Sequence, residues 1–346
     1  MTTMLAAVFK GNGVLDVEKV HKPEIINSDE VLIKVSAAGI CGSDLHCLHV
    51  PAGQYAKPGT IMGHEFYGYV EAIGIAVTEY KVGDCVVVDN IMKCHTCDYC
   101  KRGMDNLCPN SLIYGQTLNG GFAQFAVILE SQLFHMSDKI PSFIAAQTEP
   151  LACVMNAITK LNPTPAENIL IYGAGPIGLT FIRVMKLYGV KRLAVCELSA
   201  SRREMALKCG ADIVIDSVNE DIEAVLRKAW GNVCDTIVDA VGAGPIFGQA
   251  VNLLKCGGRL LIFGQNASAI SKVAPSVITR NELTVMGSYC PHNTFPIAID
   301  LLHDERLELE RIVSHKMELK DIKEGIALLD RQEASRVIIY PNGFRD

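Results

Sequence analysis

Four cysteines lie close together in the segment KCHTCDYCKRGMDNLCPN. They are Cys94, Cys97, Cys100 and Cys108, with the spacing C-x2-C-x2-C-x7-C. Four thiolates on one loop suit a tetrahedral zinc ion, and a site with four protein ligands has no open position for a substrate. The segment therefore predicts a structural zinc site, which stabilises the fold and does no chemistry.

Two other uses of a cysteine-rich segment can be weighed against zinc. The first three cysteines and the pair Cys108-Pro109 match a bacterial ferredoxin loop. That loop, however, has three residues before its last cysteine, which binds a second cluster whose ligands this chain lacks. Disulfides need an oxidising compartment, and the start MTTMLAAVFKGNG shows no secretory signal pattern. An iron–sulfur electron carrier is the alternative to zinc, and His95 inside the loop is expected to be exposed.

A second group of possible metal ligands is dispersed along the chain. Cys41 lies in GICGSDLH, His64 and Glu65 lie in MGHEFYGYVEAIG, and Glu149 lies in TEPLACVMNAI. A single residue of any of these types is more often a core or surface residue than a ligand. The neighbouring glycines, the two acids and a nucleotide motif downstream favour a shared site. A Cys/His/carboxylate set with one open position is the arrangement of catalytic zinc.

The nucleotide motif is G-x-G-x-x-G, formed by Gly173, Gly175 and Gly178. It follows the apolar stretch NILIY, expected to be a strand, and opens a stretch with helical spacing. The first glycine makes a tight turn, the second lets a pyrophosphate approach the backbone, and the third lets helix and strand pack. Pro176 suits the first helical turn, and Ile177 completes the motif. We expect the helix N-terminus to face the phosphates.

The cofactor is expected to be NAD. Glu197 ends the next strand, and a carboxylate there can accept hydrogen bonds from ribose hydroxyls and would repel a 2′-phosphate. Ser199, Arg202 and Arg203 follow closely, and arginine is what a phosphate would need, so NADP is the less favoured alternative. The second alternative is a doubly wound domain that binds no nucleotide.

The elements that must position these residues fall into two kinds. Up to about residue 150, short β-branched and aromatic runs are separated by Gly, Pro, Asn or Asp, which indicates a β-rich region. From about residue 168, apolar strands alternate with helical stretches, which predicts a parallel sheet covered by helices. The fold class is therefore α/β, with a Rossmann-type doubly wound sheet and a second, β-rich domain.

The composition excludes several kinds of partner. The chain has 346 residues, a net charge of -6 and no basic run, so nucleic acid is not expected to bind. Its most apolar stretch, NILIYGAGPIGLTFIRVM, is interrupted by glycine, proline and Arg183, so no membrane span is predicted. The expected partner is a small molecule, and the expected location is the reducing cytoplasm.

The segment GHEFYGYVEAIG matches the signature G-H-E-x2-G-x5-G, and with it the chain resembles the zinc-dependent medium-chain dehydrogenase/reductase family. The resemblance covers essentially the whole length. It implies a GroES-like catalytic domain over 1–152 and 291–346 and a Rossmann domain over 153–290. It also implies two zinc ions per chain and a homo-oligomer, a dimer or a tetramer.

Within that family, CGSDLH, GHE and EPLA resemble the sorbitol (polyol) dehydrogenase branch. The resemblance implies a catalytic zinc held by Cys41, His64 and Glu65, with Glu149 as a fourth ligand, directly or through water. It also implies that Ser43 and His46 relay a proton, and we expect Asp44 to orient the loop between them.

Two departures from sorbitol dehydrogenases concern the substrate pocket. Cys47 replaces an aromatic residue after the relay histidine, and Ser288-Tyr289 replaces an Arg-Tyr pair, so that only Tyr289 is retained. These departures do not favour sorbitol itself. The expected substrate is a secondary alcohol of a polyol, cyclitol, sugar alcohol or its phosphate. Alternatives are an L-threonine 3-dehydrogenase, a simple alcohol dehydrogenase, and a catalytically silent dinucleotide-binding protein.

Overall fold

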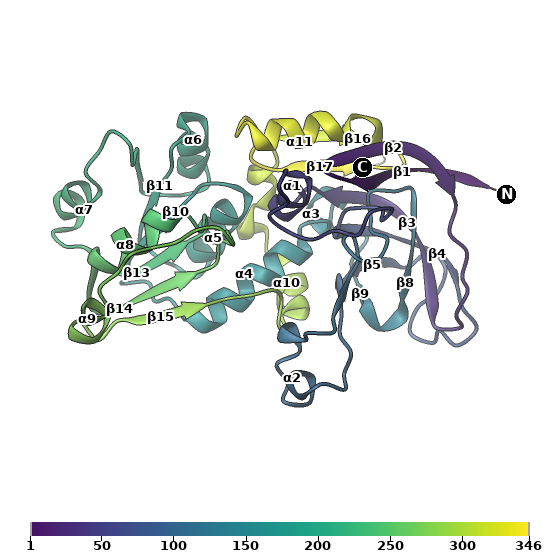
Figure 1. Ribbon diagram of the computed structural model, residues 1–346, viewed down its shortest axis with the longest axis horizontal. Coiled ribbons are helices and arrows are strands. Elements are labelled where there is room, and N and C mark those ends of the chain that lie inside the picture. The colour runs from purple at the N-terminus through teal and green to yellow at the C-terminus, as the bar shows by residue number, and fades with distance from the viewer. Residues whose placement is uncertain (1, 345–346) are drawn as a thin grey trace. The chain divides into compact units, whose positions relative to one another are not determined.

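The computed structural model describes residues 2–344 (Figure 1). The chain forms two compact units. Unit 1 contains the described residues up to Ala152, Pro291–Asp304 and those from Val313 onward, and unit 2 contains Cys153–Cys290 and Glu305–Ile312. The segment 305–312 was expected in the first of these units. It lies in unit 2 because the buried guanidinium of Arg183 donates hydrogen bonds to the carbonyls of Arg306 and Leu307 at 2.8 and 3.0 Å.

Unit 1 is rich in strands, as the sequence predicts. An antiparallel ribbon is formed by β1 (Thr3–Gly11) and β2 (Val14–His21), and β6 (Ile91–Met92) pairs with β7 (Leu112–Ile113). The larger sheet has the order β16-β17-β3-β4-β5-β9, and β8 also pairs with β3. Its members are β3 (Glu30–Gly39), β4 (Glu65–Ile73), β5 (Cys85–Val88), β8 (Phe125–Leu129), β9 (Leu133–His135), β16 (His315–Glu318) and β17 (Val337–Tyr340). The C-terminal strand β17 thus completes a sheet begun near the N-terminus.

Unit 1 also contains short helices. They are α1 (Gly42–Leu48), α2 (Asp98–Lys101), α3 (Ser142–Ala145), α10 (Phe295–Leu302) and α11 (Ile322–Asp330), with 3-10 turns η1 (Asp105–Leu107), η2 (Glu130–Gln132) and η5 (Leu319–Asp321). The helix α4 (Thr148–Leu161) begins in unit 1 and ends in unit 2.

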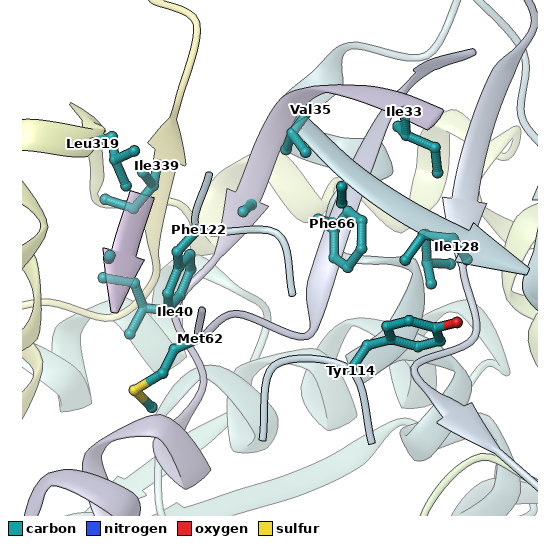
Figure 2. Close-up of a cluster of buried hydrophobic side chains, with 14 of the residues drawn as sticks. Ile33, Val35, Ile40, Met62, Phe66, Tyr114, Phe122, Ile128, Leu319 and Ile339 are labelled. Carbon is teal, nitrogen blue, oxygen red and sulfur yellow. The ribbon is translucent and has the colours of Figure 1, made fainter. Parts of the chain in front are cut away.

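The core of unit 1 is built from alternating residues of its strands (Figure 2). Ile33 and Val35 of β3 lie two positions apart, so both point to the same face of the sheet, and both are fully buried. They pack in one cluster with Phe66 of β4, Ile128 of β8 and Ile339 of β17. Burying an aliphatic or aromatic side chain of this size contributes about 1.5–3 kcal/mol. This packing fixes β4, whose first residues carry the candidate site.

Unit 2 is a doubly wound α/β unit, which confirms the predicted fold class. Its six strands are all parallel and have the order β12-β11-β10-β13-β14-β15. They are β10 (Asn168–Tyr172), β11 (Arg192–Cys196), β12 (Ile213–Ile215), β13 (Cys234–Asp239), β14 (Leu254–Ile262) and β15 (Thr284–Gly287). The order turns back at β10 and β13, and ligands bind at such a switch point, beyond the carboxyl ends of the strands.

The helices of unit 2 connect successive strands of this sheet (Figure 1). They are α5 (Pro176–Leu187), α6 (Ala200–Lys208), α7 (Ile222–Trp230), α8 (Gly244–Asn252) and α9 (Pro275–Arg280), with 3-10 turns η3 (Glu305–Leu307) and η4 (Leu309–Ile312). None of the helices in the described part of the chain combines the length and the hydrophobicity that a membrane crossing needs.

Candidate functional site

Three of the dispersed residues come together at one end of β4. Cys41 is the N-cap of α1, His64 immediately precedes β4, and Glu65 is its first residue. The thiol, a ring nitrogen and a carboxylate oxygen of these residues all lie within 4.8 Å of one another. Gly63 makes this approach possible: its φ is +89°, and a Cβ there would lie 2.5 Å from the ring of Phe122. The predicted Cys/His/carboxylate set is thus assembled by the fold.

Asp44 connects two residues of this set, Cys41 at the start of α1 and His64 before β4. One of its oxygens accepts a hydrogen bond from the backbone N–H of Cys41 at 2.9 Å, and the other lies 3.3 Å from Nδ1 of His64. A carboxylate at one ring nitrogen orients a histidine so that the other nitrogen can bind a metal. That other nitrogen, Nε2, lies 3.3 Å from the hydroxyl of Ser43. Ser43 is therefore beside the face of His64 that a metal would use.

The charges at this set favour a cation. Burial alone would lower the pKa of His64, but the negative charge of Asp44 outweighs it and raises this pKa well above its usual value. Burial and the charge of Glu65 raise the pKa of the Cys41 thiol. Both groups thus hold protons that a metal ion must displace, and a bound dication would reverse the local electrostatics.

Glu65 is held by a partner from the far end of the sequence. One of its oxygens forms an ion pair with the guanidinium of Arg336, which also donates to the carbonyl of Ile40 at 3.4 Å. The other oxygen, Oε1, is buried and has no hydrogen-bond partner among the described residues. An orphaned buried carboxylate oxygen beside a thiol and an imidazole fits a zinc ion, which binds all three donor types.

Arg336 was not foreseen from the sequence. It stands at the start of the apolar segment RVIIY. An arginine is rarely buried unless it is paired, so its place beside a buried strand is the one sign in the sequence that it neutralises a buried acid. Gly39 on the adjoining strand leaves the space for this pair, since a Cβ there would lie 2.4 Å from the Glu65 carboxylate.

The other two members of the predicted site lie on nearby elements of unit 1. Glu149 is in the first turn of α4 and is 8% exposed, but its carboxylate is not one of the atoms that cluster around Cys41. Its part as a fourth ligand stays a prediction. His46 lies in the last turn of α1 and is half-buried. Burial, and then the charge of His49, lower the pKa of His46, so the ring remains neutral to a lower pH.

The four clustered cysteines converge on a second point. Their sulfur atoms lie within 4.8 Å of one another, and the distances from Cys97 to Cys100 and Cys108 are 3.5 and 3.8 Å. Four sulfurs about 2.3 Å from one zinc ion would lie about 3.8 Å apart at tetrahedral angles. A disulfide would bring two sulfurs to about 2.05 Å, which is much shorter than these separations.

Cys94 and Cys100 of this lobe differ in how readily their thiols ionise. The backbone N–H of Thr96 is the main cause that lowers the pKa of Cys94 to about 5, whereas desolvation raises that of Cys100 to about 12. The Cys100 thiol therefore needs a cation beside it to ionise at neutral pH. As predicted, His95 is exposed.

The glycine motif lies between β10 and α5, at the carboxyl end of the central strand. Gly173 has a φ of +95°, and a Cβ on Gly178 would lie 2.0 Å from the carbonyl oxygen of Gly173. A Cβ on Gly175, the N-cap of α5, would meet no atom within 4 Å. Two of the glycines are therefore required by the turn and its packing, while the third leaves open space where a pyrophosphate can approach. Pro176 begins the helix and Ile177 follows it, both half-buried.

Glu197 connects this loop to the next strand. Its carboxylate accepts hydrogen bonds from the backbone N–H groups of Ala174 and Ser199 at 2.8 and 2.9 Å. Arg203 is committed elsewhere, because its guanidinium binds the carbonyls of Glu197 and Leu198. Arg202 is half-buried, and burial lowers its pKa.

The two expected pocket residues lie in different units. Cys47 is 1% exposed and packs in the core of unit 1, on the same buried face of α1 as Asp44. That position gives it a packing role, and its part in a substrate pocket stays a prediction. Tyr289 follows β15 in unit 2 and is 44% exposed, and its carbonyl accepts a hydrogen bond from Asn156 at 3.3 Å.

Comparison with known proteins adds family models and relatives. The alcohol dehydrogenase GroES-like domain matches residues 27–138, and the zinc-binding dehydrogenase model matches residues 176–304. The chain is 35% identical to D-altritol 5-dehydrogenase of Agrobacterium fabrum, over 84% of this chain and 86% of that one. It is 31% identical to sorbitol dehydrogenase of Bacillus subtilis, over 98% of each. L-threonine 3-dehydrogenase of Pyrococcus abyssi is 34% identical, over 89% of this chain and 90% of that one.

Solved structures are similar to this fold over nearly the whole chain. An alcohol dehydrogenase of Escherichia coli CFT073 complexed with NADH is similar with a TM-score of 0.91 and 29% identity, over 98% of this chain and 100% of that one. A zinc-binding dehydrogenase of Sinorhizobium meliloti 1021 bound to NADP has a TM-score of 0.93 and 28% identity, over 99% and 100%. These matches confirm the GroES-like domain and the Rossmann domain that the resemblance implied. The chain belongs to the zinc-dependent alcohol dehydrogenases of the medium-chain dehydrogenase/reductase family.

Proposed function

We propose that the protein is a zinc-dependent dehydrogenase that oxidises a secondary alcohol of a polyol, or of its phosphate, with NAD. The observation that carries this proposal is the convergence of Cys41, His64 and Glu65 beside the hydroxyl of Ser43. The set has too few protein ligands to close a tetrahedral site, so a substrate has a position to occupy. The altritol and sorbitol dehydrogenases among the relatives support the polyol class.

The residues of the chain would share the work as follows. Zinc would supply a Lewis acid that makes the substrate hydroxyl more acidic, and NAD would accept the hydride. Asp44 fixes the orientation of His64, and Arg336 offsets part of the charge of Glu65. The Ser43 hydroxyl accepts the substrate proton in a hydrogen bond and passes it on toward His46. A neutral His46 is the proton acceptor, which its lowered pKa favours.

The second zinc ion is assigned to Cys94, Cys97, Cys100 and Cys108. With four thiolates this site would be closed, and it would stabilise the lobe around α2 and η1. For the cofactor, Glu197 supports NAD, because a 2′-phosphate would face a buried carboxylate while the Arg203 guanidinium is already committed. Solved relatives carry NADH in one case and NADP in another, so both must be assayed.

Assembly and location are part of the same proposal. We expect a homodimer or homotetramer; β15 is an edge strand, which leaves one side of the six-stranded sheet available for pairing. The sulfur atoms of the cysteine cluster are too far apart for disulfides, which supports a reducing, cytoplasmic setting. Light scattering of the purified protein gives the number of chains.

The test of the proposed function is a substrate panel read as NADH formation. The zinc-loaded protein is incubated with NAD and, separately, with polyols, polyol phosphates, threonine and ethanol. The proposal expects the highest kcat/KM for a polyol or its phosphate. A clear preference for threonine would favour the second candidate, which the threonine dehydrogenase relative supports. No turnover with any alcohol would contradict the proposal.

A further inference from the structure

Two histidines, His46 in the last turn of α1 and His49 at its C-cap, are close enough to interact. The rings of His46 and His49 meet edge to face, with centroids 5.7 Å apart. Residues three positions apart lie on the same side of a helix, so the contact follows from the helical spacing. His46 is half-buried, and its ring also lies 3.6 Å from the position that a Cβ on Gly53 would take. His49 is exposed and directly follows the last residue of α1.

His49 is fixed by a partner from another helix. Its Nε2 lies 3.1 Å from an Asp330 oxygen at the end of α11. His49 and Asp330 line a groove between α1 and α11. The other charged residue of α11 that lines this groove is Lys323, and it pairs with Asp16 of β2 at 2.9 Å. On the buried side of α1, Asp44 is engaged by the backbone of Cys41 and by His64. The ring of His49 thus contacts that of His46, and Asp330 holds it in that position.

We propose that His49, anchored by Asp330, sets the pH range over which His46 can accept a proton. His49 is then a positioning residue that acts through His46, and the inference rests on the proposed function of His46 in the proton path. None of the zinc ligands is needed for this coupling, because it depends only on the distance between the two rings.

The physical basis is repulsion between two imidazolium charges. A proton on His49 disfavours a second proton on His46, and the charge of His49 is a cause of the lowered pKa of His46, after burial. Across a separation of this size, the repulsion corresponds to about half a pH unit in bulk water and to about two pH units at the lower effective dielectric constant near a protein surface. Because the His49–Asp330 pair is exposed, salt should weaken the effect.

The direct test is a histidine NMR titration of the full-length, zinc-loaded protein. His49→Gln removes the charge and should raise the titration midpoint of His46 by about half a unit to two units. His49→Lys keeps a positive charge, so the midpoint should stay at or below the wild-type value. His303→Gln, an exposed histidine after α10, is the matched control and should leave His46 unchanged. A role in packing alone would move the two His49 variants in the same direction.

The kinetic counterpart is the pH profile of kcat/KM with NAD and the best polyol. The acid limb should move with the NMR midpoint in each variant, and the difference should shrink in about 1 M salt, where charges are screened beyond about 3 Å. An unchanged His46 midpoint in His49→Gln overturns the inference. A shifted midpoint without a matching shift in kcat/KM would leave the coupling intact and remove His46 from the proposed proton path.

Discussion

Glu65 and Arg336 form an ion pair whose side chains are only 1% and 2% exposed. The pair joins the first residue of β4 to the segment that precedes β17, 271 positions away in the sequence. One carboxylate oxygen is bound to the guanidinium, and the other has no hydrogen-bond partner in the described part of the chain. Arg336 therefore fixes Glu65 while one oxygen stays available for a cation.

Replacing Arg336 should destabilise the fold. Arg336→Met leaves the Glu65 carboxylate buried without its counter-ion, which costs about 3–5 kcal/mol of unfolding free energy. The loss should be smaller in zinc-loaded protein than in chelator-treated protein, because a bound cation offsets the same charge. Urea unfolding of both forms measures the difference.

The control for this change is Arg331→Gln. Arg331 pairs with Glu324 and Glu333 at 3.2 and 3.0 Å, but all three side chains are about half exposed. Exposed pairs of this kind contribute little to stability, because water and salt screen them. Equal losses in the two arginine variants would show that the Glu65–Arg336 pair has no special place in the fold.

The cysteine cluster should matter for stability rather than for turnover. Cys97→Ser should lower the zinc content from about two ions per chain to about one and reduce the melting temperature or the soluble yield. Cys256→Ser, at an exposed thiol, should change neither quantity. Metal analysis and thermal unfolding give the answer. If Cys97→Ser instead lowered kcat in a fully folded, zinc-replete protein, the structural assignment of this lobe would be wrong.

Two substitutions in the glycine motif should have different effects, one on stability and one on cofactor binding. In Gly178→Ala the new methyl would lie 2.0 Å from the Gly173 carbonyl, so stability should fall. In Gly175→Ala the methyl meets no protein atom, so stability should hold while NADH affinity drops roughly tenfold or more, about 1.4 kcal/mol. Gly248→Ala on α8, where a Cβ comes no closer than 3.6 Å, is the control for both.

Calorimetric titration with NADH and thermal unfolding distinguish the three glycine variants. Undiminished NADH affinity in Gly175→Ala would mean that this loop does not receive the pyrophosphate.

The pH dependence of alcohol oxidation should reflect the lowered pKa of His46. His46 accepts a proton only when it is neutral, and a pKa below its ordinary value of 6.5 keeps it neutral to lower pH. The midpoint of the acid limb of kcat/KM should therefore lie below pH 6.5. His46→Gln should lose this limb and about 10²-fold in rate. An acid limb centred above the ordinary histidine value would contradict the assignment.

Local patterns carried most of what the sequence could predict. The four cysteines lie on one short loop, and the glycine motif joins a strand to the helix that follows it, so spacing alone indicated both sites. The strands around Ile33 and Ile171 were visible as apolar runs, because buried strands must be apolar. The parallel sheet followed from their alternation with helical segments.

Contacts between distant segments could not be read in this way. Arg336 reaches Glu65, and Asp330 reaches His49, only because the C-terminal segment returns to the sheet of unit 1. No periodicity in either segment specifies its partner, and such pairs depend on the register of β17 against β3. The contact of Asp44 with His64 likewise depends on how α1 packs against the start of β4.

The central claim is that the reaction takes place at Cys41, His64 and Glu65 and not at the cysteine cluster. The most direct measurement is polyol-dependent NADH formation, with zinc content, for His64→Ala and for His95→Asn. His95 is an exposed residue within the cluster segment, and Asn tolerates its φ of +55°. The account predicts that His64→Ala binds NADH, loses about one zinc ion per chain and forms no NADH, while His95→Asn matches the wild type. A wild-type rate in His64→Ala would contradict it.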